Sequence, residues 1–501
     1  MSSHMFSSIF VLLCFLFVIN GANLIDGFNG LLTINLIIIN IILAYININN
    51  NNLEFSILII SQIIILLSFL LFNFPSAKIF LGDSGAYTLG ALTSLNTIMT
   101  NNLNPNISSF FFCTLLFYLF LLLSFCKIKS GRKLTNQIKK IGIITSGGDC
   151  GGLNAVINGA ARMAYYEGIQ VCLIPNGYAG LYNLEDLEPV IIDMARADRI
   201  HSGVAGSEAG HSRVKIDKIN DENKYEKIKR GLKKHNIDGL IIAGGDDTGS
   251  VVVDLVSKGI KCVHVPKTMD LDLQTYSVGG DSTINRIAKF TDDLRTTGLT
   301  HNRALIIEVF GRYAGHTAFR GGIGADADAI LIPEVFVDYR ILYEHFKQTY
   351  INRLYNSDVK GSTYIIVTAE GVKNKEGKFF TDDVNRADSF GHQRLTGVGQ
   401  YIRANLENYM KIDPDWQRVL KEQAIFVEGI YEYPEIRELQ LGHLVRAGDT
   451  SAYDVTFGKQ GGGAAVQLMK ANIFGVTVVG IEANEINYLP VKEAIEQNVT
   501  P

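Results

Sequence analysis

Charged residues are distributed so unevenly that this chain must contain two parts of different kinds. The first 126 of its 501 residues hold only four charged side chains, Asp26, Glu54, Lys78 and Asp83. The chain has 46 Lys and Arg and 50 Asp and Glu residues in total, so nearly all of them follow residue 126. The charge-poor part is apolar enough for a membrane, whereas the remainder has the composition of a soluble globular protein.

The first part is built from apolar runs separated by short polar loops. Five runs fall near Phe6–Ile19, Leu31–Tyr45, Phe55–Phe72, Ala86–Met99 and Ser109–Phe125. Because about 20 apolar residues span a bilayer as a helix, the series predicts a multi-pass α-helical membrane fragment over 1–126. Met1–Asn20 can also be read as a signal peptide, although it lacks a basic start and an A-x-A-like cleavage site.

A basic junction over 127–138 follows the last run and sets the expected orientation. Lys127, Lys129, Arg132 and Lys133 lie in it. Basic residues stay on the cytoplasmic side, so this end is predicted to be cytoplasmic. Counting back through the runs places the loop with Asp26 and the loop with Lys78 and Asp83 on the same face. Acidic residues at a membrane face are costly and are usually functional.

Two segments of this part carry a specific resemblance. They read Asn20-Gly-Ala-Asn-Leu-Ile-Asp26-Gly-Phe-Asn-Gly-Leu31 and Pro75-Ser-Ala-Lys78-Ile-Phe-Leu-Gly-Asp83-Ser-Gly85. Together they resemble the polyprenyl-phosphate sugar-1-phosphate transferases. The resemblance implies that Asp83 binds Mg²⁺ and that Asn23 and Asp26 line the site. The family's upstream Asp-Asp motif and downstream His-rich loop are missing, so 1–126 is interpreted as a middle fragment with a vestigial site.

From Lys139 onward the pattern changes to alternating strands and helices, which is typical of a parallel α/β sheet. Strands are expected over Lys140–Thr145, Gly239–Ala243 and Lys261–Val265, with helices from about 154 to 167 and from about 250 to 258. Glycine-rich loops, Ser146–Gly152 and Gly244–Ser250, follow the first two strands. Such loops let backbone N–H groups approach a phosphate, although a plain strand–helix turn has the same appearance.

Acidic residues gather at the ends of the three strands. They are Asp149, Asp246, Asp247, Asp270 and Asp272. The last two belong to the segment Pro266-Lys267-Thr268-Met269-Asp270-Leu271-Asp272, which ends the third strand. Ligands bind at the carboxyl ends of parallel strands, and clustered carboxylates are costly unless a metal or a cation such as Lys267 balances them. Helix-capping aspartates are the alternative interpretation.

Six motifs from this part occur in a familiar order. They are Ser146-Gly-Gly-Asp149, Gly244-Gly-Asp246, the segment Pro266–Asp272, Phe310-Gly-Arg312-Tyr-Ala-Gly315, Ala369-Glu370-Gly371 and Leu441-Gly-His443-Leu-Val-Arg446. The series is similar to that of the 6-phosphofructokinases over 139–501. The resemblance implies two Rossmann-like domains, a donor-binding lobe and a sugar-phosphate-binding lobe. It also implies Mg²⁺-dependent phosphorylation of the 1-hydroxyl of fructose 6-phosphate in glycolysis.

The same resemblance assigns roles to single residues. Asp270 matches the general base and is grouped with Lys267 and Arg312 as catalytic, whereas Asp246 and Asp272 match Mg²⁺ ligands. Further sugar-phosphate ligands are matched by Thr268, Asp272, Arg303, Phe310, Gly311, Glu370, Arg437, His443 and Arg446. Donor ligands are matched by Gly147, Arg213, Asp246, Asp247 and Lys267. Counterparts of Arg303 and Arg437 reach a neighbouring subunit's site, so a homodimer or homotetramer is expected.

Two positions bear on the phosphoryl donor. ATP-using relatives usually have small residues where Asp247 and Lys267 stand, whereas pyrophosphate-using relatives carry Asp and Lys. Asp247 would place bulk and negative charge where the α-phosphate of ATP lies, and Lys267 would add a cation for compact pyrophosphate. Pyrophosphate is therefore the favoured donor and ATP the alternative. The pattern departs from the family at Leu271, where Asn is usual, and at Cys150-Gly151.

The remaining features set limits on the function. A net charge of −4 argues against a nucleic-acid partner. The six cysteines form no CxxC pair, which suits a reducing cytoplasm. The catalytic part is accordingly predicted to be cytoplasmic and the N-terminal part to lie in the cell membrane. Two other functions stay open: a membrane sugar-1-phosphate transferase with an accessory domain, and a noncatalytic sugar-phosphate sensor.

Overall fold

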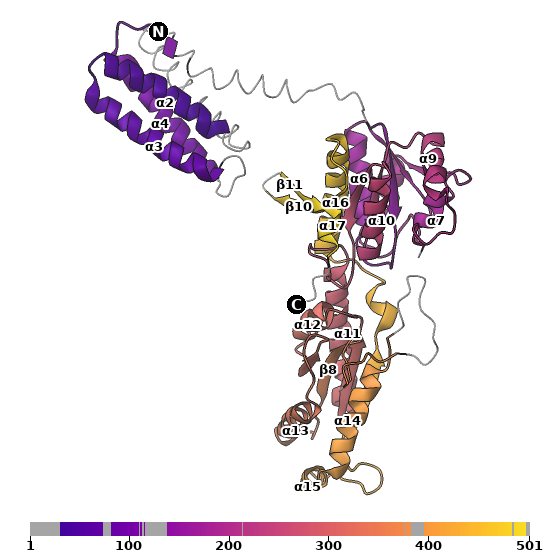
Figure 1. The fold of residues 1–501 in the computed structure, drawn as a ribbon. Helices are drawn as coiled ribbons and strands as arrows, with labels where there is room; N and C mark the ends of the chain where they lie inside the picture. Colours follow the sequence, from indigo (N-terminus) through magenta and orange to yellow (C-terminus); the bar gives the residue numbers. More distant parts are fainter. Residues whose placement is uncertain are drawn as a thin grey trace. The chain divides into compact units, whose positions relative to one another are not determined.

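A computed structural model gives the fold of this chain (Figure 1). It describes residues 31–73, 82–109, 111–112, 115, 138–212, 214–374, 376–381, 395–482 and 485–496. The chain divides into two compact units, Met1–Thr135 and Asn136–Pro501. Each unit is described by itself.

Among the described residues of the N-terminal unit are three long helices (Figure 1). They are α2 (Leu31–Asn49), α3 (Leu53–Asn73) and α4 (Gly82–Leu103), and they cover the second, third and fourth apolar runs. Within the described residues, two stretches, Leu32–Asn49 and Leu53–Phe72, are long and apolar enough to cross a membrane by length and composition. The first run, and most of the fifth, lie outside the described residues, so the multi-pass count stays a prediction.

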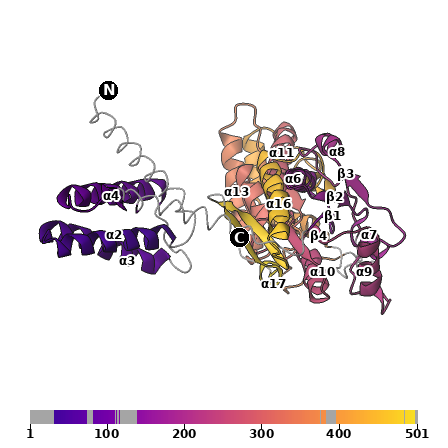
Figure 2. The same ribbon diagram turned by 90° about the horizontal axis from the view of Figure 1, so that it is seen from above.

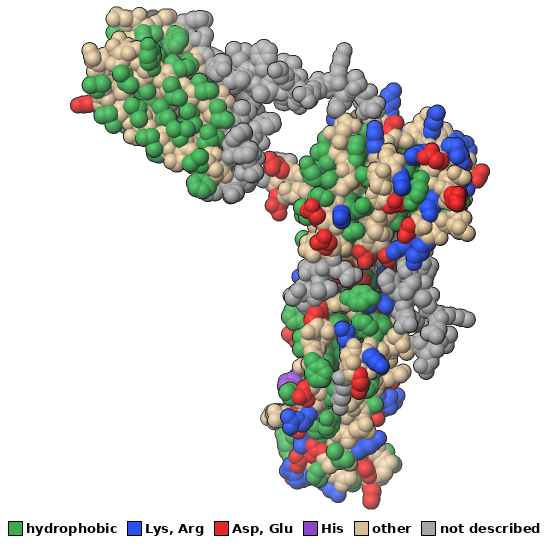
Figure 3. Space-filling view, in the orientation of Figure 1, with side chains coloured by type: hydrophobic (Ala, Val, Ile, Leu, Met, Phe, Trp, Pro, Cys, Tyr) green, Lys and Arg blue, Asp and Glu red, His purple; other side chains and the backbone are tan. Residues whose placement is uncertain are grey.

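The described helices of this unit bury polar as well as apolar side chains and expose many large apolar ones. Figure 3 shows hydrophobic side chains over most of its visible face, whereas charged side chains are scattered over the C-terminal unit. Buried polar residues of the three helices include Asn40, Asn47, Gln62, Thr93, Asn96 and Thr100. Large exposed apolar residues include Tyr45, Ile57, Ile64, Ile65 and Leu71, at 58% to 80% exposure. Large apolar side chains on the outside, together with carboxamides in the interior, are unusual for a water-soluble helical bundle.

The buried polar residues form a seam between α2 and α4 that repeats one heptad along each helix. The side-chain amide of Asn40 donates to Thr93 at 3.3 Å, and that of Asn47 donates to Thr100 at 2.8 Å. Asn96 links the seam to α3, because its amide donates to the side-chain oxygen of Gln62 at 2.6 Å. Buried carboxamides are thereby satisfied by one another.

The C-terminal unit is built on two sheets. The larger has the order β11-β10-β5-β4-β1-β2-β3, and the smaller has the order β7-β8-β6-β9. The larger sheet comprises β1 (Lys140–Thr145), β2 (Gln170–Leu173), β3 (Val190–Ile192), β4 (Gly239–Gly244), β5 (Cys262–Pro266), β10 (Val476–Glu482) and β11 (Glu485–Pro490). Its inner strands are parallel and its two edge strands antiparallel.

The smaller sheet is parallel throughout. It comprises β6 (Arg303–Val309), β7 (Ala329–Leu331), β8 (Tyr364–Ala369) and β9 (Glu435–Gln440). The α/β class with parallel sheets is confirmed.

Helices cover these sheets and connect the two lobes (Figures 1 and 2). Those of the first lobe are α6 (Leu153–Tyr166), α7 (Gly177–Tyr182), α8 (Met194–Arg199), α9 (Lys224–Lys234), α10 (Asp246–Ser257), α16 (Ala452–Lys470) and α17 (Val491–Ala494). Those of the second are α11 (Gly280–His301), α12 (His316–Gly324), α13 (Tyr339–Tyr355), α14 (Val398–Ile412), α15 (Asp415–Glu422) and the 3₁₀ turn η1 (Gly442–Val445). The chain enters the second lobe through α11 and returns through α16.

The local predictions around the glycine loops are largely confirmed. The first strand has the predicted bounds, and the helix expected from about 154 to 167 is α6. The second helix was predicted to start near Ser250, but α10 starts at Asp246. Asp246 and Asp247 therefore lie in its first turn rather than in a loop. Acidic side chains are favourable there because the N-terminus of a helix carries partial positive charge.

Candidate active site

The carboxyl ends of strands from both sheets come together between the two lobes. Arg446, which follows β9 and η1, donates from Nη1 to the backbone oxygen of Asp149 at 3.2 Å. Asp149 lies in the glycine loop after β1. Nearby backbone bonds join Ala205 to Gly448 and Thr450 to Gly203, both at 2.8 Å. The structure thus brings together motif residues that lie almost 300 positions apart.

The segment after β5 is held in place by its own hydrogen bonds. The backbone N–H of Val278 donates to the oxygen of Pro266 at 3.0 Å. The Thr268 hydroxyl accepts from the backbone N–H of Asp270 at 3.1 Å and donates to the Asp272 carboxylate at 3.3 Å. Thr268 therefore holds the backbone of Asp270 and the carboxylate of Asp272.

Leu271 connects these two carboxylates in an unusual backbone conformation. Its φ is 57°, in the left-handed region that Asn adopts readily and Leu does not. The side chain is 8% exposed and packs against Gly280, where an added Cβ would lie 2.2 Å from a Leu271 methyl. The departure from the family pattern thus coincides with a strained position whose side chain is buried.

The aspartates of the site influence one another. Burial raises the pKa of Asp270, an effect that Arg446 and Lys267 oppose and that Asp246 strengthens. Burial also raises the pKa of Asp272 to about 7, and the negative charges of Asp270 and Asp246 add to the shift. These three carboxylates lie close enough to repel, as the sequence predicted.

A shared divalent cation fits this donor set. The residues that could hold it are Asp246 and Asp272, whose oxygens are ligands that Mg²⁺ accepts. Among the residues that the structure describes, no group of three or more His, Cys, Asp or Glu side chains could hold a metal alone. Mg²⁺ typically binds to one or two carboxylates together with substrate phosphates, and this arrangement matches that pattern.

The glycine loop after β1 is fastened to the catalytic segment by a lysine. The Lys267 ammonium donates to the backbone oxygen of Gly148, and Lys267 is only 4% exposed. Burial lowers its pKa. On the other side of the loop, Nδ1 of His211 lies 3.0 Å from the backbone oxygen of Gly147. Burial, reinforced by the charge of Lys267, lowers the pKa of His211 to about 4, so the imidazole is neutral near pH 7.

Glu370 and Arg312 face the same centre from the second lobe. Gly371 permits this, because an added Cβ there would lie 2.0 Å from the backbone oxygen of Arg312. Burial, reinforced by the charge of Asp270 and opposed by that of Arg312, raises the pKa of Glu370 to about 7. The Arg446 guanidinium lies 4.8 Å from the centre of the Phe310 ring, which in turn is 5.7 Å from the His443 ring.

Arg303 and Arg437 lie away from the other site residues of this chain. Arg303 begins β6 and pairs in register with Glu435 at the start of β9. The Glu435 carboxylate contacts Arg303 Nε at 2.5 Å and also Arg437. Because strands rise about 3.3 Å per residue, this cluster lies about 20 Å along β6 from Phe310 and Gly311.

Several residues with predicted roles lie outside the described residues. These are Arg213, Asn23 and Asp26. Asp83 belongs to α4, but its side chain is also outside the described part. Their assigned roles stay predictions.

The whole arrangement can be compared with known proteins. The family model described as Phosphofructokinase matches residues 140–469, which is more than half of the chain. The chain belongs to the phosphofructokinase family. Phosphofructokinases are phosphotransferases, and the site described above contains the acidic and basic groups that such chemistry requires.

Curated phosphofructokinases cover most of the C-terminal unit. The ATP-dependent 6-phosphofructokinase 2 of Clostridium perfringens is 33% identical over 381 residues, 74% of this chain and 95% of the relative. The pyrophosphate–fructose 6-phosphate 1-phosphotransferase of Dictyoglomus thermophilum is 31% identical over 350 residues, 69% of this chain and 90% of the relative. Relatives named for either donor are thus similar at nearly the same level.

Solved structures agree on the fold. The pyrophosphate-dependent phosphofructokinase of Marinobacter aquaeolei has a TM-score of 0.54 and 21% identity, covering 72% of this chain and 84% of its own. Phosphofructokinase from Saccharomyces cerevisiae has the same TM-score at 22% identity, covering 72% of this chain and 45% of its own. In the N-terminal unit, the model Glycosyl transferase family 4 matches residues 2–101. Both resemblances seen in the sequence are confirmed.

Proposed function

We propose that the chain is a pyrophosphate-dependent 6-phosphofructokinase that phosphorylates the 1-hydroxyl of fructose 6-phosphate. The observation that carries this proposal is the environment of Asp270. Its carboxylate is buried between cations from both lobes, Lys267 and Arg446, and faces Asp246. A base, a set of phosphate-binding cations and a place for a divalent ion therefore meet at one point.

Asp270 accepts the proton of the sugar hydroxyl as that oxygen attacks the phosphoryl group. Burial raises the pKa of Asp270, which makes it a better base than a free aspartate, and the charges of Arg446 and Lys267 oppose that shift. Arg312 and Lys267 offset the negative charge that spreads over the transferring group. Mg²⁺ held by Asp246 and Asp272 would neutralise further phosphate charge when bound.

The donor assignment rests on Asp247 and Lys267. Lys267 joins the loop after β1 and so places its ammonium beside the backbone where a donor phosphate would bind. Asp247 occupies the first turn of α10, and we propose that its side chain narrows the same site. A compact donor fits such a site better than a nucleotide. ATP is the alternative donor, because relatives named for ATP are equally similar.

The sugar phosphate is proposed to bind His443 and Arg446 of one chain together with Arg303 and Arg437 of a neighbour. Glu435 already holds the last two guanidinium groups side by side, and Arg437 is half exposed. Because these residues lie at the far end of β6 and β9, a complete site requires a second copy. We therefore propose a homodimer, which is the smallest symmetric assembly that completes the site, or a homotetramer.

The N-terminal unit is proposed to anchor the enzyme in the cell membrane, with the C-terminal unit in the cytoplasm. Support comes from its apolar exterior and its internally satisfied polar seam, which are typical of helices packed in lipid.

A donor comparison on the full chain tests the proposed function. The detergent-solubilised protein is supplied with fructose 6-phosphate and Mg²⁺, and with either pyrophosphate or ATP. We expect kcat/KM for pyrophosphate to exceed that for ATP by at least about tenfold. Turnover with ATP alone would overturn the donor assignment, and no turnover with either donor would favour a noncatalytic sensor.

A further inference from the structure

A lysine outside every motif reaches into the proposed donor site. The Lys215 ammonium forms an ion pair with the carboxylate of Asp247. Both side chains are largely enclosed, at 16% and 25% exposure. Asp247 is the second residue of α10 and directly follows Asp246. The contact therefore lies one residue away from a carboxylate that faces Asp270 and Asp272.

The chain around Lys215 is built into the wall of this site. Upstream, the Thr145 hydroxyl lies 2.7 Å from that of Ser207 and donates to the backbone oxygen of Gly210 at 3.2 Å. His211 contacts the backbone oxygen of Gly147, as described above. Directly downstream, Ile216 is fully buried. These contacts hold described residues on either side of Lys215, whose ammonium contacts Asp247.

The other partner is equally fixed. Asp247 belongs to the first turn of α10, and the next residue, Thr248, is 2% exposed. The backbone oxygen of Thr248 accepts from the Tyr178 hydroxyl at 2.8 Å. The ion pair therefore joins two largely enclosed side chains, unlike the fully exposed pairs that contribute little.

The pair has a direct consequence for a polyphosphate donor. Without Lys215, Asp246 and Asp247 would place two adjacent negative charges beside phosphates that are themselves negative. With Lys215, Asp247 narrows the site by its bulk while its charge is cancelled. We propose that Lys215 is a positioning residue of the donor site, which holds Asp247 in place and removes its repulsion of the donor phosphates. This inference rests on the proposed function, since it concerns the donor of that reaction.

Removing the charge of Lys215 should weaken donor binding, because the carboxylate of Asp247 then repels the donor phosphates. Full-length chain in detergent micelles is titrated calorimetrically with magnesium pyrophosphate, and the KM for the same donor is measured in parallel. We expect Lys215→Met to raise the Kd and the KM about tenfold. Lys215→Arg keeps the charge, so it should stay within about threefold of the wild type. In an Asp247→Asn background, Lys215→Met should cost less than about twofold, because the repulsion is already gone.

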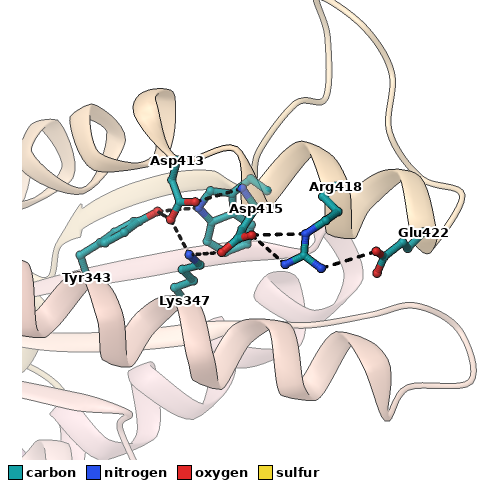
Figure 4. A network of polar contacts seen from close by, with 7 residues as sticks. Tyr343, Lys347, Asp413, Asp415, Arg418 and Glu422 are labelled. Atoms are coloured by element: carbon teal, nitrogen blue, oxygen red, sulfur yellow. Dashed lines mark hydrogen bonds and ion pairs between the residues drawn. The ribbon is translucent and has the colours of Figure 1, made fainter.

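The chain offers a matched control in the second lobe. Figure 4 shows Lys347 on α13 between Asp413 and Asp415, each at 2.6 Å. The Lys347 side chain is 16% exposed, the same fraction as Lys215. Lys347→Met therefore removes an equally enclosed lysine from an ion pair that lies outside the donor site. Its Kd for magnesium pyrophosphate should equal that of the wild type.

Two results would overturn the inference. One is an unchanged Kd in Lys215→Met. The other is a loss of the same size in the Asp247→Asn background, which would mean that Lys215 contacts the phosphates directly. If the wild type turns over ATP only, the pyrophosphate assignment fails, and titration of the same variants with magnesium ATP decides the role of Lys215 independently. Equal losses in Lys215→Met and Lys347→Met would show a general effect on folding and would also refute it.

Discussion

The backbone of Leu271 offers a sharp test of how the catalytic segment is strained. Its left-handed conformation costs a non-glycine residue about 1 to 2 kcal/mol. Against this, burial of the side chain over Gly280 stabilises the fold by about 2 kcal/mol. In Leu271→Asn the new residue adopts the conformation readily but loses the apolar contact. We therefore expect a net destabilisation of about 1 kcal/mol.

Leu273 provides the matched control two residues away. It is 3% exposed and is absent from the described residues with positive φ. Leu273→Asn loses a similar burial and also buries an amide, but it relieves no strain, so it should cost about 1 to 2 kcal/mol more than Leu271→Asn. The assay is the Tm of each full-length variant, followed through the transition of the C-terminal unit. If Leu271→Asn lowers the Tm as much as Leu273→Asn does, the strain at Leu271 is refuted.

Three further predictions follow from the site and from the N-terminal unit. Asp270→Asn should lower kcat about 10²- to 10⁴-fold. If two subunits share each site, mixing this variant with an equally inactive Arg437→Ala chain should restore about a quarter of wild-type activity. No recovery of activity would exclude a shared site. Because the pKa of Glu370 is raised in the folded chain, its protonated side chain contributes to the free energy of unfolding. This contribution is complete below about pH 4.5 and is lost as the pH rises to about 7. The free energy of unfolding of the wild type, relative to that of Glu370→Gln, should therefore fall by about 3 kcal/mol over that pH range. Thermal unfolding at each pH measures this difference. A difference that does not depend on pH would contradict the raised pKa of Glu370. Asn96→Leu should destabilise the N-terminal unit in detergent by about 1 kcal/mol, because the side-chain oxygen of Gln62 loses the hydrogen bond from Asn96. The control Leu95→Val, at an exposed position, should cost less than about 0.5 kcal/mol. Equal effects of the two substitutions would mean that the seam has no structural role.

Local sequence patterns predicted the strand and helices that carry the site, but they misplaced the start of one helix. The apolar run of β1 and the glycines after it identified a strand and the helix α6 with nearly correct bounds. The start of α10 was misplaced because Gly244-Gly-Asp-Asp-Thr-Gly has loop-like composition. Acidic residues favour a helix N-terminus, so the helix includes Asp246 and Asp247 instead of following them.

Long-range contacts explain what the sequence could not show. Lys215 and His211 flank Arg213 in the sequence, but nothing local indicates that they meet Asp247 and Gly147. Asp454 is a second example, because its fully buried carboxylate accepts hydrogen bonds from Tyr276 at 2.7 Å and from the Ser282 hydroxyl at 2.6 Å. These contacts join α16 to the start of α11 across more than 170 residues. Only the folded chain reveals them.

The sequence shows part of the polar seam of the N-terminal unit, namely the spacing of its residues. Asn40 and Asn47 are spaced one heptad apart, and Thr93 and Thr100 repeat the same spacing on α4. Their pairing depends on how α2 and α4 pack, which hydropathy alone does not determine. The apolar runs therefore predicted the helices, whereas the structure shows which polar side chains pair between them.

Phosphorus NMR of a single reaction tests the central proposal most directly. The full-length chain in detergent is given fructose 6-phosphate, Mg²⁺ and equal concentrations of pyrophosphate and ATP, and the phosphorus resonances are followed over time. The account predicts that fructose 1,6-bisphosphate and orthophosphate appear while the ATP resonances stay constant, and that Asp270→Asn abolishes both products on the same timescale. Consumption of ATP with pyrophosphate unchanged, or no sugar bisphosphate at all, would contradict it.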